Sequence, residues 1–182
     1  TKTVTSHAVL GGHSQIRIGN AAKVSLLAER KGQGVEAVVY VTNSESGHAL
    51  PTGIPARKLV LAARVLDDQG RALDTKEIEY RKILADRSGA EISNDRITDM
   101  FLKAAKVISD NRVRPQETRR ETVLFGGPVP KGPLAVEAVL RYEFHPQLPG
   151  NQSAMQFVMA NDTFNLPTRS RLPGKGVVIA AA

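Results

Sequence analysis

Alternation of apolar and polar residues with a period of two recurs along this chain and limits the folds that it can adopt. The clearest case is residues 134–144, LAVEAVLRYEF. One face would carry Leu134, Val136, Ala138, Leu140, Tyr142 and Phe144, and the other Glu137, Arg141 and Glu143. Because successive side chains of a β-strand point to opposite faces, this pattern predicts a strand with one face on a core and one in water.

Further stretches have the same alternation or are more continuously apolar. Residues 34–43 and 57–68 are the most apolar, which is typical of central strands covered on both faces. The others are 21–30, 73–84 and 119–125. Turn residues separate several of them, as at 68–70 and 126–128, so each stretch is predicted to be a separate short strand.

Residues 94–109 allow two interpretations. Their apolar residues recur at helical spacing, namely Ile97, Met100, Phe101, Ala104 and Ile108, behind a potential cap at Asn94 or Asp95. We therefore favour a short helix or an irregular excursion. A short strand at 101–108 is the alternative.

About seven short strands without alternating helices predict an all-β fold, an antiparallel immunoglobulin-like β-sandwich with at most a short helix. Within the 182 residues we expect an extended amino-terminal segment over 1–20 and the sandwich over 21–145. Residues 146–182 are expected to form a carboxy-terminal extension that packs on the sandwich or trails from it.

The charge of the chain favours acidic partners. It has 25 Lys and Arg against 18 Asp and Glu, a net charge of +7. The basic residues are scattered without interleaved aromatics, so we expect no nucleic-acid partner. The densest cluster, Arg112, Arg114, Arg119 and Arg120, is predicted to be a solvated strand face. No apolar run approaches the roughly 20 residues that a membrane span needs.

The first residue is Thr1 rather than methionine, which we take as the sign of a processed or excised product. The chain contains no cysteine, so a disulfide framework and a thiolate metal site are excluded.

The stretch GHALPTGIPAR, residues 47–57, is predicted to be a stiff, non-helical loop. Pro51 and Pro55 fix their own φ angles, and Gly53 between them can take a positive φ. Such a loop would hold His48 and Arg57 in fixed positions, as a binding site requires. In the alternative interpretation, His48 is buried and hydrogen-bonded to backbone, and Arg57 pairs with a carboxylate such as Asp67.

His7 and His13 lie six residues apart in a glycine-containing stretch. No zinc motif has that spacing, so a metal site made of His7, His13 and His48 is the least favoured hypothesis, and with it a metal-dependent enzyme. No nucleophile, base and orienting group can be assembled, and no phosphate-binding loop is present. We expect no catalytic residue and no enzyme activity.

Three pieces of the chain resemble multihaem cytochrome c proteins, in the segment around their carboxy-terminal β-sandwich. The first, 42–73, is similar to a pattern of Asn, Gly-His-x-x-Pro-Thr-Gly, Pro, Arg and Asp-x-x-Gly. It is matched by Asn43, Gly47, His48, Pro51, Thr52, Gly53, Pro55, Arg57, Asp67 and Gly70. The second, 109–125, matches through Asp110, Asn111, Arg112, Val113, Pro115 and Glu117. The third is SHAVLGGHS, with His7 and His13.

The resemblance implies a haem-free module, because c-type haem is attached through Cys-x-x-Cys-His and this chain has no cysteine. A haem-bearing cytochrome segment or subunit is then the expected partner. His48, His7 and His13 could donate distal axial ligands to its haem c, and Arg57 would suit the propionates. We expect a non-catalytic electron-transfer module, periplasmic or extracellular. The alternative is an immunoglobulin-like cell-surface binding or assembly module without a redox role.

Overall fold

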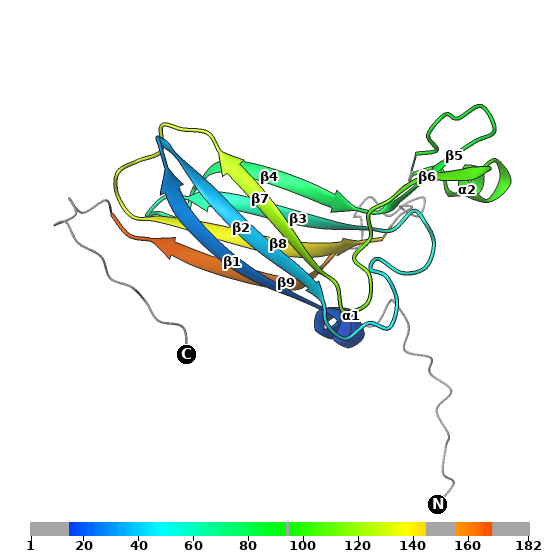
Figure 1. The fold of residues 1–182 in the computed structure, drawn as a ribbon, viewed down its shortest axis with the longest axis horizontal. Helices are drawn as coiled ribbons and strands as arrows, with labels where there is room; N and C mark the ends of the chain where they lie inside the picture. Colours follow the sequence, from blue (N-terminus) through cyan, green and yellow to red (C-terminus); the bar gives the residue numbers. More distant parts are fainter. Residues whose placement is uncertain (1–14, 94, 145–155, 169–182) are drawn as a thin grey trace, which may run out of the picture.

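Two packed antiparallel sheets make up most of the computed structural model, which describes residues 15–93, 95–144 and 156–168 (Figure 1). The three-stranded sheet has the order β1–β2–β7, formed by β1 (Ala22–Lys31), β2 (Gly34–Asn43) and β7 (Thr118–Phe125). The four-stranded sheet has the order β4–β3–β8–β9, formed by β3 (Lys58–Leu66), β4 (Ala72–Tyr80), β8 (Leu134–Glu143) and β9 (Gln156–Leu166). The predicted all-β sandwich of about seven strands is confirmed.

The strand order differs in one place from that of an immunoglobulin constant domain. There the fourth strand pairs with the fifth, whereas here β4 pairs with β3 in a hairpin. The similarity to that fold in particular stays a prediction.

The core lies between the two sheets, where the central strands face each other. Val39 of β2, Leu61 of β3 and Leu140 of β8 are each 0% exposed. The stretches predicted to be central, 34–43 and 57–68, are β2 and β3, and both have a strand on either side. The outer face of β3 is buried over Val60 and Ala62, whereas alternate residues of β2 are only half-buried, so the expectation of two covered faces is correct for β3 and not for β2.

The predicted inner face of β8 is buried, but its outer face is not fully in water. Val136, Leu140 and Tyr142 are at most 1% exposed, as the alternation predicts. Val139 and Glu143, on the other face, are also buried. For Glu143 the expectation was wrong because Lys58 and Arg141 flank its carboxylate and shield it from solvent.

One hydrogen bond links the sheets at each long edge of the sandwich. The hydroxyl of Tyr80 at the end of β4 donates to Glu121 of β7 over 3.1 Å. At the other edge, the backbone N–H of Leu26 in β1 donates to Oδ2 of Asp162 in β9 over 2.8 Å. The second of these bonds also pairs a backbone N–H at the edge of β1.

The chain between β4 and β7 forms an arm that projects beyond one end of the sandwich (Figure 1). The arm comprises β5 (Lys82–Ala85), α2 (Ile97–Leu102) and β6 (Lys106–Asp110), and β5 pairs with β6. Its small core buries Ile92 and Met100 together with Ala56.

The two interpretations of residues 94–109 are therefore each correct for a part of the segment. A short helix forms first, and a strand follows it. The cap expected at Asn94 or Asp95 is not at Asp95: the helix begins after Arg96 without a side-chain cap, and Asn94 lies outside the described residues. The predicted strand 73–84 is divided at Arg81 into β4 and β5.

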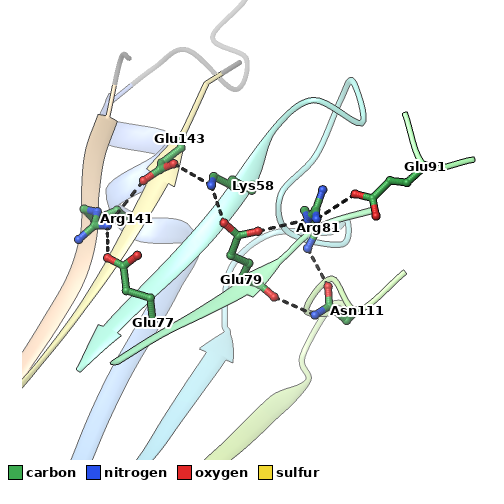
Figure 2. Close-up of polar contacts among 8 residues, drawn as sticks. All are labelled: Lys58, Glu77, Glu79, Arg81, Glu91, Asn111, Arg141 and Glu143. Atoms are coloured by element: carbon green, nitrogen blue, oxygen red, sulfur yellow. Dashed lines mark hydrogen bonds and ion pairs between the residues drawn. The ribbon is translucent and has the colours of Figure 1, made fainter. Parts of the chain in front are cut away.

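A polar network on the outer face of the four-stranded sheet continues into the arm (Figure 2). Its members are Lys58, Glu77, Glu79, Arg81, Glu91, Asn111, Arg141 and Glu143. Lys58 contacts Glu79 at 2.5 Å and Glu143 at 3.5 Å, so it joins β4 to β8. Arg81 contacts Glu79 at 3.2 Å and Glu91 at 3.1 Å, and its backbone N–H donates to Asn111 over 2.7 Å. The network therefore fixes the arm against the sandwich.

The predicted limits of the sandwich are too narrow at both ends. Residues 15–20, expected to be extended, belong to α1 (Gln15–Ala21), whose Ile18 is buried in the main core. Residues 156–166, assigned to a carboxy-terminal extension, form β9 and complete the four-stranded sheet.

Replacing Leu140 by alanine tests the packing of the two sheets. Because this side chain is 0% exposed, Leu140→Ala should lower the free energy of unfolding by about 2 to 5 kcal/mol in urea denaturation. The matched control is Leu124→Ala, at a side chain 61% exposed, which should change it by less than about 0.5 kcal/mol. Equal losses in the two variants would contradict this assignment of faces.

The Tyr80–Glu121 hydrogen bond predicts a particular alkaline response. Burial, and then the charge of Glu121, raises the pKa of the Tyr80 phenol. As the pH rises above about 10, the unfolded state loses this proton and the folded state keeps it, so stability falls. Tyr80→Phe should lower the free energy of unfolding by about 0.5 to 1.5 kcal/mol at pH 7. Above pH 10, the stability of this variant should decline less steeply than that of the parent chain. Urea denaturation at a series of pH values measures the loss at pH 7 and the decline above pH 10. If the stability of variant and parent declines in parallel, Tyr80 does not cause the alkaline loss.

Candidate functional site

The loop between β2 and β3 is held by a buried side-chain amide. Asn43, the last residue of β2, is 0% exposed. Its Nδ2 donates to the carbonyl oxygens of His48 at 2.8 Å and Val113 at 3.1 Å, and its Oδ1 accepts from the backbone N–H of Ser46 at 3.2 Å. A buried amide is tolerated when its donors and acceptor are paired, as they are here.

The same loop is joined by backbone hydrogen bonds to the connection between β6 and β7. Leu50 and Val113 exchange two hydrogen bonds of 2.9 Å each, and the N–H of Gln116 donates to the carbonyl oxygen of Asn43 over 2.9 Å. The two longer pieces of sequence similarity, 42–73 and 109–125, therefore meet at this end of the sandwich.

His48 is exposed, and it is held by its backbone rather than by its ring. Its carbonyl oxygen accepts from Asn43 and from the hydroxyl of Ser46. Within the described ranges, its imidazole makes no hydrogen bond or ion pair. The alternative of a buried histidine that pins the loop is thus wrong, because Asn43 performs that function.

His48 borders a pocket of about 490 Å³. One wall comes from α1, with Arg17 and Ile18, and another from the loop, with Leu50. Tyr142 of β8 and Met159 of β9 complete it. The lining also includes the charged side chains Arg17 and Glu45, so the pocket is suited to a mostly apolar ligand with a few polar groups.

Arg57 braces the other side of the loop. Its Nη1 donates to the carbonyl oxygen of Thr52 over 3.2 Å, and its guanidinium lies 5.2 Å from the ring centroid of Phe144. The hydroxyl of Tyr142 donates to the same carbonyl over 3.1 Å. Burial raises the pKa of this phenol, and the positive charge of Arg57 opposes the rise.

Gly53 has the positive φ that the sequence indicated, 89°. A Cβ there would lie 2.6 Å from Nη1 of Arg57, so glycine also leaves room for the guanidinium. The suggested pairing of Arg57 with Asp67 is wrong, because Asp67 binds Arg71 at 2.7 Å, beyond the far end of β3.

Among the described residues, His48 and Arg57 line different pockets. Arg57 borders a separate cleft of about 10 Å³ with Lys82 and Arg112. Arg112 makes a two-point contact with Asp110, with both distances 2.7 Å. The basic cluster predicted as a solvated strand face is thus partly engaged in local ion pairs.

Two of the predicted site residues, His7 and His13, lie outside the described residues. Among the described residues, no cluster of three or more His, Asp and Glu side chains could hold a metal. Nor does any described helix have the length and hydropathy to cross a membrane.

Sequence reasoning missed Asn43, Thr52 and Tyr142 as the groups that position the loop. Asn43 was visible only as one member of the family-like pattern. A single asparagine at a strand end does not reveal which carbonyls it will meet, since those lie 5 and 70 residues away along the chain.

The fold is similar to part of a penta-heme cytochrome c552 from Thermochromatium tepidum, with a TM-score of 0.68 and 23% identity. The match covers 86% of this chain but only 42% of that one. A structural-genomics target aligns with a TM-score of 0.42 and 13% identity, over 89% of this chain and 98% of that one. Neither a protein-family model nor a curated protein matches the chain.

The separate contributions of Asn43 and His48 to the stability of the protein can be measured. Asn43→Ala removes two hydrogen-bond donors and one acceptor at a residue that is 0% exposed, and should lower the free energy of unfolding by about 1 to 3 kcal/mol. His48→Ala removes an exposed ring and should change it by less than about 0.5 kcal/mol. Urea denaturation of both variants provides the comparison; a larger loss for His48→Ala would mean that the ring, not the amide, holds the loop.

Proposed function

We propose that this chain is a non-catalytic β-sandwich module of a multihaem cytochrome c type electron-transfer protein. It would dock on, or shield, a haem held by another segment or subunit, in the periplasm or outside the cell. His48 would supply its imidazole as a distal axial ligand. The exposed ring of His48, on a backbone that other residues fix, is the observation that carries this proposal.

The pocket beside His48 fits contact with one face or edge of a haem. Ile18, Leu50 and Met159 give it an apolar wall against which a porphyrin could pack. Arg17 at the same pocket supplies a cation for a propionate, and the net charge of +7 acts in the same direction. Arg57 would contribute indirectly, because it braces Thr52 in the loop that carries His48.

A module of this kind cannot attach c-type haem covalently, since the chain has no cysteine. The haem would therefore come from elsewhere, and an imidazole from outside the attachment motif would complete bis-histidine ligation. The structural similarity supports this setting, because the matched protein is a penta-heme cytochrome and more than half of its chain lies outside the match.

The first expectation concerns colour. The purified chain should lack a Soret band, because no residue of it can hold haem covalently.

A haem c peptide with one axial histidine and an open sixth position is then the probe for His48. On titration, the parent chain should convert the peptide to the low-spin spectrum of bis-histidine haem, and His48→Ala should weaken this conversion by about tenfold or more, equivalent to about 1.4 kcal/mol.

The control variant is His145→Ala, which removes a different imidazole of the chain. It should bind the peptide as the parent chain does. Equal spectra for the parent chain and His48→Ala would overturn the role of His48. Absence of any binding in all three proteins would favour the binding module without a redox role.

A further inference from the structure

We infer that the small cleft between the β2–β3 loop and the base of the arm binds one small anion, of the size of chloride, and that this anion ties the arm to the sandwich. The inference is independent of the proposed redox function, because the cleft is separate from the pocket beside His48. It rests on the charge of the lining, on an ammonium group that lacks a hydrogen bond, and on the size of the cleft.

Three basic side chains from different segments line the cleft, and no acidic residue of the described chain does. Arg57 stands at the end of the loop, directly before β3. Lys82 is the first residue of β5, where the arm begins, and Arg112 follows β6, where the arm returns. A cleft whose charges all have one sign focuses their field and raises the local concentration of counter-ions, which here are anions.

The rest of the lining comes from the loop and is largely apolar. It consists of Pro51, Gly53, Ile54 and Pro55. The side chains of Lys82 and Arg112 are only 29% and 21% exposed. Charges in such surroundings are screened less by water and salt than charges on an open surface. An anion in this cleft would therefore be attracted more strongly than one beside a fully exposed lysine.

The nearby carboxylate of Asp110 satisfies Arg112 but not Lys82. It contacts Arg112 through both oxygens, at 2.7 Å each, whereas its Oδ2 lies 3.7 Å from Nζ of Lys82. That separation is too long for a hydrogen bond, and the Lys82 ammonium donates to no other described residue. An ammonium group has three donors and is here partly shielded from water. An anion in the cleft would supply the acceptor that it lacks.

The volume of the cleft limits the size of the anion. It is about 10 Å³, which is room for about one water molecule. A monatomic anion such as chloride is comparable in size. Larger acidic ligands, such as nucleotides or acidic peptides, would have to stay largely outside. Free chloride is therefore the occupant that fits.

An anion held by these three side chains would touch the loop and both ends of the arm at once. Arg81 already reaches the polar network on the sandwich (Figure 2), and the next residue, Lys82, reaches the cleft. The arm would then be tied at two points. One tie is made by the protein alone, and the other requires the anion.

The first test measures the binding of chloride by the line width of its NMR signal in solutions of the 182-residue chain. The parent chain should broaden the signal in a saturable manner. Lys82→Gln removes one charge from the cleft and should weaken the affinity by about tenfold or more. Lys82→Arg keeps the charge and should retain most of the affinity.

The matched control is Lys106→Gln, which removes the same charge from the other end of the β5–β6 pair. It should bind chloride as the parent chain does. Equal affinities for Lys82→Gln and Lys106→Gln would mean that chloride follows only the net charge of +7, and would overturn the site. The absence of saturable broadening with the parent chain would overturn it as well.

Hydrogen exchange then tests whether the anion ties the arm to the sandwich. The backbone N–H groups of Ala105 and Asn111 donate to Ala85 and Arg81 at 2.8 and 3.3 Å, so their exchange reports on opening of the arm. With chloride at about ten times its dissociation constant, both should exchange about tenfold more slowly in the parent chain, because opening must release the anion.

The same two variants separate this protection from general effects of salt. Lys106→Gln should show all of the protection by chloride, and Lys82→Gln should show little of it. If chloride binds at the cleft but leaves the exchange of these N–H groups unchanged, the anion does not tie the arm and the inference is overturned.

Discussion

The buried amide of Asn43 is the interaction on which the loop end of this protein depends. It ends β2 in one sheet, and its hydrogen bonds reach the loop that leads to β3 in the other sheet and the connection that leads to β7. An amide that lost these partners would be costly, because its own polar atoms are buried and would have no hydrogen bond. One side chain thus links the β2–β3 loop, which crosses from one sheet to the other, to the β6–β7 connection, which leads back from the arm.

These hydrogen bonds of Asn43 explain how the loop can present a histidine whose ring makes no hydrogen bond to the described residues. In many rigid loops an imidazole is used to satisfy backbone groups. Here Asn43 and Ser46 satisfy the carbonyl oxygen of His48, while Arg57 and Tyr142 satisfy that of Thr52. The ring is therefore not required for the structure of the loop, and chemistry at its nitrogens need not compete with folding.

The sequence allowed the sandwich to be predicted well where burial follows the alternation of side chains, as in β2, β3 and β8. It failed for β9, because the middle of that strand reads Asn161–Asp162 and the pairing with β8 shifts register between Leu140 and Arg141. Asp162 is polar because it accepts a hydrogen bond from Leu26 in the opposite sheet. Such a partner lies 136 residues away and has no local signature. The site was predictable as a stiff loop with His48, but the hydrogen bonds of Asn43 that hold the loop were not.

The outer polar network and the apolar arm are parts of one arrangement. A single exposed ion pair contributes little to stability. The main consequence of the network is therefore that it orients the arm relative to the sandwich. Glu143 is nearly buried between Lys58 and Arg141, and a buried charge strongly disfavours geometries in which its partners are displaced. From Lys58 the contacts pass through Glu79 to Arg81, at the point where β4 gives way to β5 (Figure 2). The direction of the arm is thereby specified by the sandwich, through contacts that join β8 and β4 to Arg81, where the arm begins.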